Sequence, residues 1–362
     1  MMKWLLIGLL AVFLLLGSFL LTPSPVDSKA WQAPAPPAMT GVLAANERLR
    51  LADLLARGQV SGPEDVAVAA DGAVYSGMAD GRIVRLDADG RAHTWVNTGG
   101  RPMGLVFDAN GNLIVADAER GLLSITPAGA ISVLAREAKG TLFHLTSGVD
   151  IASDGGIYFT DASSRFAPGD YRYDLLEMRP WGRLLRYNPA SGRVEVLMDN
   201  LHFPAGVTVS SDGRYLLLAE TWKYRILKYH LHGPAEGQAE VFIDNLPGFP
   251  GDLGIDREQR HWVAFLSPRH RQVDALHRQP WLKDLVAKLP GRLRPWPEPY
   301  GLVVAYDADG QALISLHDTR GTHVRALSSV TPQDGALYFG SLHNDRIARL
   351  PFHAIPGLGD ES

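Results

Sequence analysis

Two histidines could carry acid–base chemistry, because each stands directly ahead of a predicted apolar strand. His144 precedes the strand that starts at Ser147, and His202 precedes the pair Phe203-Pro204. Histidine titrates near neutral pH, so either side chain could act as a general base. A histidine beside a strand start can equally be a hydrogen-bonded structural residue, and the sequence leaves both interpretations open.

Several other classes of chemistry are excluded by the motifs that the sequence lacks. It contains no Gly-x-Ser-x-Gly elbow, His-Glu-x-x-His helix, phosphate loop or dinucleotide fingerprint, so we expect no serine hydrolase, zinc protease or nucleotide-binding protein. It has no cysteine, which excludes disulfides and cysteine nucleophiles and leaves the compartment undecided. The net charge is -4 and no basic stripe is present, so nucleic acid is not an expected partner.

The elements that must position these side chains follow from a repeat. A small or Pro-Gly start, an alternating apolar strand, an Asp-Gly or Asn-Gly turn and a second apolar strand recur six times. A period of about 40 to 45 residues with such turns is typical of four-stranded propeller blades. The sequence therefore predicts an all-β, six-bladed β-propeller, in which the first residues of each inner strand surround one mouth of the channel. The six copies begin at Gly62, Arg101, Ser147, Pro204, Pro250 and Leu327.

The N-terminus predicts attachment to a membrane. Trp4 to Leu21 is an uncharged, Leu-rich run of 18 residues, close to the roughly 20 that cross a bilayer. We interpret residues 1–22 as an uncleaved signal anchor and transmembrane helix, with cleavage after Ala30 as the alternative. Lys3 on the short side places the propeller on the extracytoplasmic, periplasmic side of the cell membrane. Residues 23–45, rich in Pro and Ala, read as an extended linker.

One long insertion interrupts the repeats of the predicted propeller domain at 46–356. Between about 267 and 300, apolar residues recur at helical spacing from Val273 to Leu289, interrupted only by Pro280. This pattern predicts a helical cap. The cap could be a substrate lid or a second membrane contact, or an insertion that simply packs on the ring with a solvated basic face.

Many short segments together resemble the strictosidine synthase-like family. The similarity covers nearly the whole chain and extends more weakly to the paraoxonase/arylesterase and gluconolactonase groups of six-bladed calcium propellers. The resemblance implies a propeller whose relatives carry out lactone and ester hydrolysis or a condensation reaction. The segments that carry it include Gly62-Pro63-Glu64-Asp65, Arg101-Pro102-Met103-Gly104-Leu105, Phe203-Pro204-Ala205-Gly206-Val207 and Leu246-Pro247-Gly248-Phe249-Pro250.

The resemblance also implies a calcium site at the channel floor, and only part of it is present. Glu64 matches the first family ligand, but Ser147, Ala205 and Gly251 stand at or beside positions where relatives carry Asn or Asp. Glu64, Ser147 and Asp252 are the metal ligands that remain, and calcium is a possible cofactor through them. Without a metal, Glu64 and Asp252 could share a proton and act as an acid/base pair, which makes Asp252 a candidate catalytic residue with the two histidines.

Two further positions bear on the reaction. Ser328 stands where the condensing enzyme of the family has its catalytic glutamate, so we do not expect amine–aldehyde condensation. Met103 stands where lactonase relatives use a histidine. We therefore expect hydrolysis of a small ester or lactone, assisted by a divalent metal if one binds. The alternative is a non-catalytic binding or assembly propeller, which the small residues Gly148, Ala205 and Gly251 favour if they open the channel floor.

Overall fold

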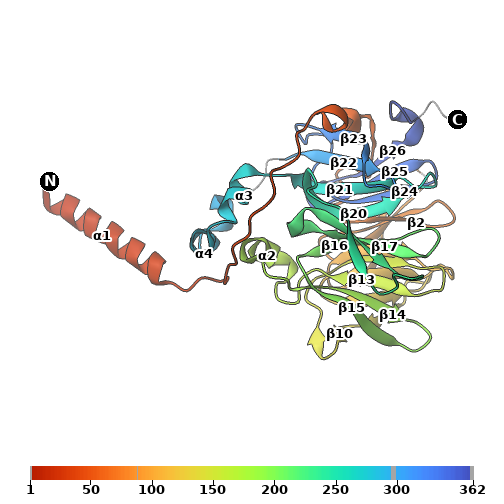
Figure 1. The fold of residues 1–362 in the computed structure, drawn as a ribbon, viewed down its shortest axis with the longest axis horizontal. Helices are drawn as coiled ribbons and strands as arrows, with labels where there is room; N and C mark the ends of the chain where they lie inside the picture. Colours follow the sequence, from red (N-terminus) through yellow and green to blue (C-terminus); the bar gives the residue numbers. More distant parts are fainter. Residues whose placement is uncertain (1, 88, 295–298, 359–362) are drawn as a thin grey trace.

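The chain folds into six four-stranded antiparallel sheets arranged as blades round a central axis (Figure 1). The computed structural model describes residues 2–87, 89–294 and 299–358. In blades 1 to 5 the innermost strand comes first in chain order, as the repeat predicts, whereas blade 6 takes its outermost strand from the N-terminal part of the chain. The six-bladed all-β propeller is confirmed.

The first three blades follow one another directly along the chain. Blade 1 comprises β2 (Val66–Val68), β3 (Val74–Gly77), β4 (Arg82–Leu86) and β5 (Ala92–Asn97). Blade 2 comprises β6 (Pro102–Phe107), β7 (Leu113–Asp117), β8 (Gly121–Ile125) and β9 (Ile131–Ala135). Blade 3 comprises β12 (Thr146–Ile151), β13 (Ile157–Asp161), β14 (Gly182–Asn188) and β15 (Arg193–Leu201), and the small hairpin β10 (Glu137–Ala138) and β11 (Thr141–Leu142) precedes it.

The remaining three blades complete the ring. Blade 4 comprises β16 (Pro204–Val209), β17 (Tyr215–Glu220), β18 (Arg225–His230) and β19 (Ala239–Ile243). Blade 5 comprises β20 (Gly248–Ile255), β21 (His261–Pro268), β22 (Gly301–Tyr306) and β23 (Ala312–Asp318). Blade 6 comprises β24 (Leu327–Gln333), β25 (Ala336–Ser341), β26 (Ile347–Pro351) and β1 (Asp53–Leu55). Short 3-10 helices lie at Gly41–Leu43, Arg48–Leu51, Pro168–Asp170, Thr221–Lys223, Gly291–Leu293 and Phe352–Ala354.

Blade 6 closes the ring with strands from both ends of the chain. β1 pairs antiparallel with β26, with Asp53 opposite Arg349 and Leu55 opposite Ile347. This pairing covers an edge that blade 6 would otherwise expose.

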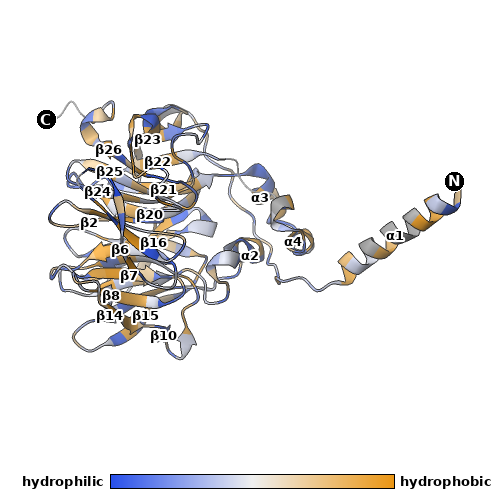
Figure 2. Ribbon diagram, turned by 180° about the vertical axis from the view of Figure 1, so that it is seen from behind, coloured by the Kyte–Doolittle hydropathy of each residue, from blue (hydrophilic) through white to orange (hydrophobic). Residues whose placement is uncertain are grey.

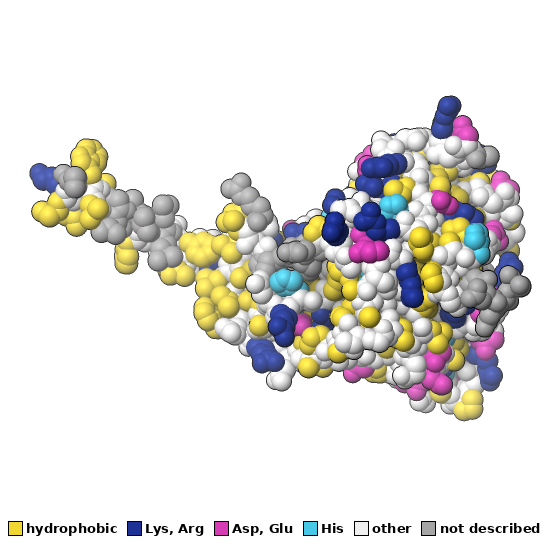
Figure 3. Space-filling view, turned by 90° about the horizontal axis from the view of Figure 1, so that it is seen from above, with side chains coloured by type: hydrophobic (Ala, Val, Ile, Leu, Met, Phe, Trp, Pro, Cys, Tyr) yellow, Lys and Arg dark blue, Asp and Glu magenta, His cyan; other side chains and the backbone are white. Residues whose placement is uncertain are grey.

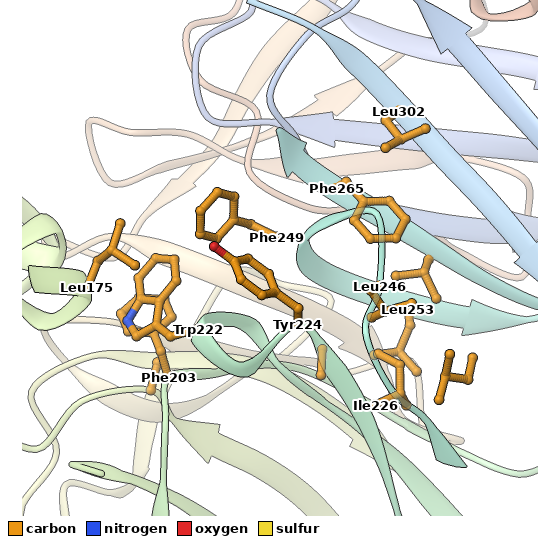
Figure 4. Packing of buried hydrophobic residues seen from close by; sticks show 14 of the residues in the cluster. Leu175, Phe203, Trp222, Tyr224, Ile226, Leu246, Phe249, Leu253, Phe265 and Leu302 are labelled. Atoms are coloured by element: carbon orange, nitrogen blue, oxygen red, sulfur yellow. The ribbon is translucent and has the colours of Figure 1, made fainter. Parts of the chain in front are cut away.

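The core lies between neighbouring blades, where strands carry apolar residues on both faces (Figure 2). Between blades 4 and 5, Trp222 packs on Phe203 with ring centroids 4.4 Å apart, and Tyr224 meets Phe249 edge-on at 4.9 Å (Figure 4). Aromatic contacts of this kind stabilise beyond the area that they bury. On the face that Figure 3 shows, positively and negatively charged side chains are interspersed.

A helical cap lies on one side of the ring (Figure 1). It contains α2 (Tyr171–Glu177), α3 (Arg271–Leu276) and α4 (Pro280–Ala287). Pro280 begins α4, where a missing N–H costs nothing, so the predicted interruption separates two short helices. Asp174 of α2 fixes this helix to blade 4 by accepting a hydrogen bond from the Trp222 indole at 2.9 Å. Residues 295–298 of the predicted insertion lie outside the described residues.

The predicted linker is extended, and it is bound to the cap. We call residues 23–40 the strap. Its Lys29 N–H donates to the Glu177 carbonyl at 2.8 Å, and its Trp31 N–H donates to the His277 carbonyl at 2.9 Å. Trp31 also lies edge-on against the His277 ring. The strap thus joins α2 to the junction between α3 and α4.

The N-terminal helix α1 covers Met2–Leu21. The side chains of residues 8–12, 15 and 16 are outside the described set. Over the part of the chain that is described, no helix is both long and apolar enough to cross a membrane. The transmembrane segment predicted at residues 1–22 is therefore not supported by the described residues.

Candidate active site

A cavity opens at one end of the channel, and all six inner strands contribute to it. Its empty volume is about 630 Å³, part of which is open solvent at the mouth. Pro168 and Tyr171, beside and within α2, line it from the cap. Blades 1 to 6 contribute, in order, Glu64, Met103, Ser147, Ala205, Asp252 and Ser328. The sequence-based prediction that inner-strand starts surround one mouth is confirmed.

Glu64 and Arg101 form an ion pair in this cavity. Glu64 is 5% exposed, and its Oε2 lies 3.0 Å from Arg101 Nη2. Burial raises the pKa of Glu64, because removing a carboxylate from water costs more than the single arginine returns. Glu64 therefore holds its proton more readily than an exposed glutamate does.

Asp252 belongs to a second set of carboxyls and is itself half-buried. Burial and the nearby Asp65 raise the pKa of Asp252 well above its usual range, and the hydrogen bond from the Leu253 N–H offsets little of this. Burial also raises the pKa of Asp65 to about 6. Asp252 lines the cavity, whereas Asp65 does not. Asp252 therefore holds its proton more readily than an exposed aspartate does, and in its protonated form it can donate a hydrogen bond into the cavity.

Asp65 and Asp150 connect neighbouring blades. Asp65 Oδ2 accepts a 2.8 Å hydrogen bond from the Leu105 N–H of blade 2, and Asp150 Oδ2 accepts one of 2.7 Å from the Val209 N–H of blade 4. Sequence analysis missed both carboxylates and Arg101. Asp65 and Arg101 were visible as charged residues inside the quoted Gly-Pro-Glu-Asp and Arg-Pro-Met-Gly segments.

The two predicted histidines lie away from the cavity. His144 is exposed, and its main-chain N–H donates to Asp161 Oδ1 at 3.2 Å. His202 is half-buried, with Nδ1 3.1 Å from Glu220 Oε1. Neither side chain lines the cavity that holds Glu64. Their catalytic roles stay predictions, and the geometry of His202 favours the structural alternative.

Comparison with known proteins decides the family. Adipocyte plasma membrane-associated protein from Mus musculus is 33% identical over 98% of this chain and 91% of that protein. Protein strictosidine synthase-like 4 from Arabidopsis thaliana is 34% identical over 84% of this chain and 83% of its own length. The chain belongs to the strictosidine synthase-like family. Residues 147–234 match the strictosidine synthase family, and residues 41–86 match the family described as "Strictosidine synthase-like, N-terminal".

Solved structures support the fold of this strictosidine synthase-like protein. A gluconolactonase from Xanthomonas campestris superimposes with a TM-score of 0.62 at 19% identity, covering 91% of this chain and 99% of that one. A calcium-binding regucalcin from Agrobacterium tumefaciens gives 0.58 at 16% identity, covering 82% and 90%. At these identities the likeness concerns the architecture alone.

The calcium ion that the family resemblance implies does not suit the donors present in this family member. Within the described ranges, no three His, Asp or Glu side chains are placed to hold a metal. Glu64 is paired with a guanidinium, which would repel a cation, and Ala205 and Gly251 supply no side-chain oxygen. A calcium ion needs six to eight oxygens. Calcium through Glu64, Ser147 and Asp252 stays an untested prediction that this donor set does not favour.

Gly148 and Gly251 lie where the backbones of neighbouring inner strands approach each other closely. A Cβ on Gly148 would lie 2.7 Å from the Ala205 carbonyl oxygen, and one on Gly251 would lie 2.6 Å from that of Ser328. Both glycines therefore allow neighbouring inner strands to approach closely. Gly148, Ala205 and Gly251 all line the cavity, and the interpretation that they open the channel floor stays a prediction.

Ser328 lines the cavity and is 7% exposed. Its hydroxyl donates to the Glu64 carbonyl oxygen at 2.5 Å, which ties blade 6 to blade 1. The expectation that amine–aldehyde condensation does not occur here stays a prediction.

Proposed function

We propose that this protein hydrolyses a small ester or lactone in the channel cavity without a metal ion. The observation that carries the proposal is the presence of two carboxyl groups with raised pKa, Glu64 and Asp252, and one arginine in the same largely apolar cavity. Groups with perturbed pKa in a cleft are candidates for acid–base catalysis. Family membership and gluconolactonase-like architecture are compatible with this reaction class but do not fix it.

Glu64 is suited to activate water. Its raised pKa brings it closer to neutral pH, where a general base is most effective, and Arg101 holds its carboxylate in one orientation. In the proposed step, the water oxygen attacks the carbonyl carbon while Glu64 accepts the water proton. The Arg101 guanidinium beside it stabilises negative charge that develops on the carbonyl oxygen.

Asp252 is suited to donate a proton, whereas Glu64 accepts one. Because the pKa of Asp252 is raised well above the usual range of an aspartate, it can hold a proton and donate it to the leaving alkoxide as the carbon–oxygen bond breaks. The proton on Glu64 then passes through solvent to the Asp252 carboxylate, and both groups return to their starting states. Apolar walls from Met103, Leu145 and Phe203 would bind the hydrocarbon part of the substrate.

Turnover of aryl esters and lactones by the full chain tests this function. We expect hydrolysis that a chelator does not diminish, and we expect Glu64→Gln to reduce kcat/KM by about 100-fold or more. Glu195→Gln, an isosteric change at an exposed position of β15, is the matched control. Absence of turnover by the folded wild type, or full activity of Glu64→Gln, would contradict the proposal and favour the binding or assembly module.

We further propose that α1 attaches the protein to a membrane with the propeller on the extracytoplasmic side. Relatives are named plasma membrane-associated, and the exposed Leu20, Leu21 and Trp281 would suit contact with lipid. Lys288 of the cap donates to the Leu20 carbonyl at 3.1 Å, so the end of α1 lies beside the cap. Membrane fractionation with a carbonate wash tests attachment, and the mass of the mature chain tests cleavage after Ala30.

A further inference from the structure

We propose that the strap is a latch that is released by acid: it holds α2 over the cavity at neutral pH and detaches from His277 when the pH falls. The inference concerns how the cover of the cavity is regulated, so its consequence for turnover rests on the proposed hydrolysis. Release of the strap is itself a structural change that can be measured without a substrate.

Main-chain groups of the strap hold the end of α2. Glu177, the last residue of α2, accepts the Asp27 N–H on its carboxylate at 3.0 Å and the Lys29 N–H on its carbonyl oxygen at 2.8 Å. The other end of α2 begins at Tyr171, which lines the cavity. A helix of seven residues is not stable by itself, so it depends on contacts such as these. The strap therefore helps to keep α2 in place over the cavity.

Two residues further along, the strap covers His277 at the junction between α3 and α4. The Trp31 N–H donates to the His277 carbonyl at 2.9 Å, and the two rings lie edge-on with centroids 5.5 Å apart. His277 is 1% exposed, and neither of its ring nitrogens has a hydrogen-bond partner among the described residues. Burying polar atoms without partners costs free energy, and release of the strap would give this ring access to water.

Three cations on separate elements face His277 and oppose its protonation while it is buried. They are Lys283 of α4, Lys223 between β17 and β18, and Arg269 between β21 and α3. Burial, and then these three cations, lower the pKa of His277 to about 3. The carboxylates in this region act on the cations: Asp274 lies 2.8 Å from Arg269, Glu177 and Asp284 act on Lys283, and Glu220 acts on Lys223.

The docked and released states of the strap therefore differ in the protons that they bind. A His277 ring in water titrates near the ordinary pKa of 6.5, whereas the covered ring stays neutral down to about pH 3. Because the released state binds the extra proton, lowering the pH below 6.5 shifts the equilibrium toward release. With these two pKa values, the equilibrium constant for release is about 25-fold larger at pH 5 than at pH 7.

Hydrogen–deuterium exchange of the full chain in detergent tests the latch. The N–H groups of Lys29 and Trp31 are bonded only while the strap is docked, so their protection factors, corrected for the intrinsic pH dependence of exchange, report its release. We expect protection in residues 27–33 to fall about 25-fold between pH 7 and pH 5, and protection in α2 to fall with it. Constant protection of the strap, or a fall that leaves α2 unchanged, would overturn the proposal.

His277→Phe removes the titrating group and keeps a ring against Trp31. Since neither ring nitrogen of His277 has a partner among the described residues, we expect this variant to fold and to protect the strap equally at pH 7 and pH 5. His232→Phe, at an exposed position between β18 and β19, is the matched control and should keep the pH dependence of the wild type. The same pH dependence in His277→Phe would assign release to another group and contradict the latch.

Ester turnover by the wild type separates this inference from the proposed hydrolysis. A strap with pH-dependent protection in a protein that hydrolyses no ester or lactone supports the latch and contradicts only the hydrolysis. A strap with constant protection in an active protein overturns the latch and leaves the hydrolysis standing.

Discussion

Two buried glutamates, Glu64 and Glu220, each pair with an arginine, yet they differ in chemistry. Glu220, at the end of β17, accepts hydrogen bonds from Arg225 Nε at 2.6 Å and from the His202 main chain at 2.7 Å. Burial acts to raise its pKa, but these bonds outweigh burial and the pKa is lowered. Glu64 has one arginine partner, and burial prevails. Between these two glutamates, the number of hydrogen-bond donors decides the direction of the pKa shift.

Other carboxylates at the ends of second strands are bonded in the manner of Glu220. Asp117, which ends β7, accepts the Arg101 N–H at 2.9 Å, and Asp161, which ends β13, accepts the Leu145 N–H at 3.1 Å. Each ties the loop ahead of an inner strand to its own blade. At Asp161 burial still outweighs these bonds and raises the pKa, so the direction of the shift depends on the balance of burial and donors at each position.

The largest expected difference between Glu220 and Glu64 is in their contribution to the free energy of unfolding. Glu220→Gln should lower the free energy of unfolding by about 2 kcal/mol, because a charge-assisted acceptor for His202 and Arg225 is lost. Arg225 is about a third exposed, which limits the loss. Glu64→Gln should change it by less than about 1 kcal/mol, since its amide oxygen can still accept from Arg101. Urea denaturation measures the change in unfolding free energy for both variants. Equal losses would contradict the distinction between Glu220 and Glu64.

Gly148→Ala tests whether backbone packing, rather than charge, holds the inner strands together. The new methyl group would lie 2.7 Å from a main-chain oxygen of blade 4. We expect a loss of about 1–3 kcal/mol in unfolding free energy from overpacking. Gly155→Ala is a poor control because its φ is positive, so Ser147→Ala at the neighbouring position serves instead. A Gly148→Ala variant as stable as the wild type would contradict this view of the channel.

The contributions of Glu220 and Asp65 to the stability of the fold should change with pH in opposite directions. Glu220, with a lowered pKa, stabilises the fold above its unfolded value of 4.5, and this contribution is lost as pH falls through the lower folded value. Asp65, raised from 3.8 to about 6, binds its proton more tightly when folded, so its contribution declines as pH rises from 3.8 to 6. Relative to the wild type, Asp65→Asn should therefore gain stability across that interval. Denaturation midpoints of both proteins, measured at several pH values, test this prediction. A loss of stability of Asp65→Asn relative to the wild type across that interval would contradict it.

The smallest expected effect is that of metal removal. A ligand that binds only the folded state at 1,000 times its Kd stabilises it by about 4 kcal/mol. Because the Glu64 carboxylate faces Arg101, we expect the Tm with excess calcium and with chelator to agree within about 1 °C. A clear rise with calcium that Glu64→Gln abolishes would restore the predicted metal site and reverse the account of Glu64.

The fold was predictable because the repeat is local. Asp-Gly turns, as at Gly72 and Gly155, have the positive φ that the turn requires, so turn positions and strand order could be read directly. The helical spacing of the insertion likewise predicted helices around Pro280. The docking of the strap on the cap was not predictable, because main-chain carbonyls such as that of Glu177 leave no pattern in the sequence.

The sequence predicted where the cavity lies better than it predicted which residues act in it. The rule that inner-strand starts meet at one mouth correctly gathered Glu64, Ser147 and Asp252 round one cavity. Arg101 was missed because partnership across blades depends on the three-dimensional approach of two strands. His202 was selected by position, although its ring is directed to Glu220. Residue type and strand position cannot show which side chains already have hydrogen-bond partners in the folded protein.

Ring closure through β1 and β26 has a consequence for how the protein is made. Residues 53–55 leave the ribosome long before their pairing partners at 347–349 are synthesised. Blade 6 therefore cannot be completed until almost the whole chain is available, and this pairing spans a very large sequence separation, which slows folding. Until then, β1 presents an unpaired edge. A chain truncated before β26 would be exposed to aggregation and proteolysis however well its first five blades had formed.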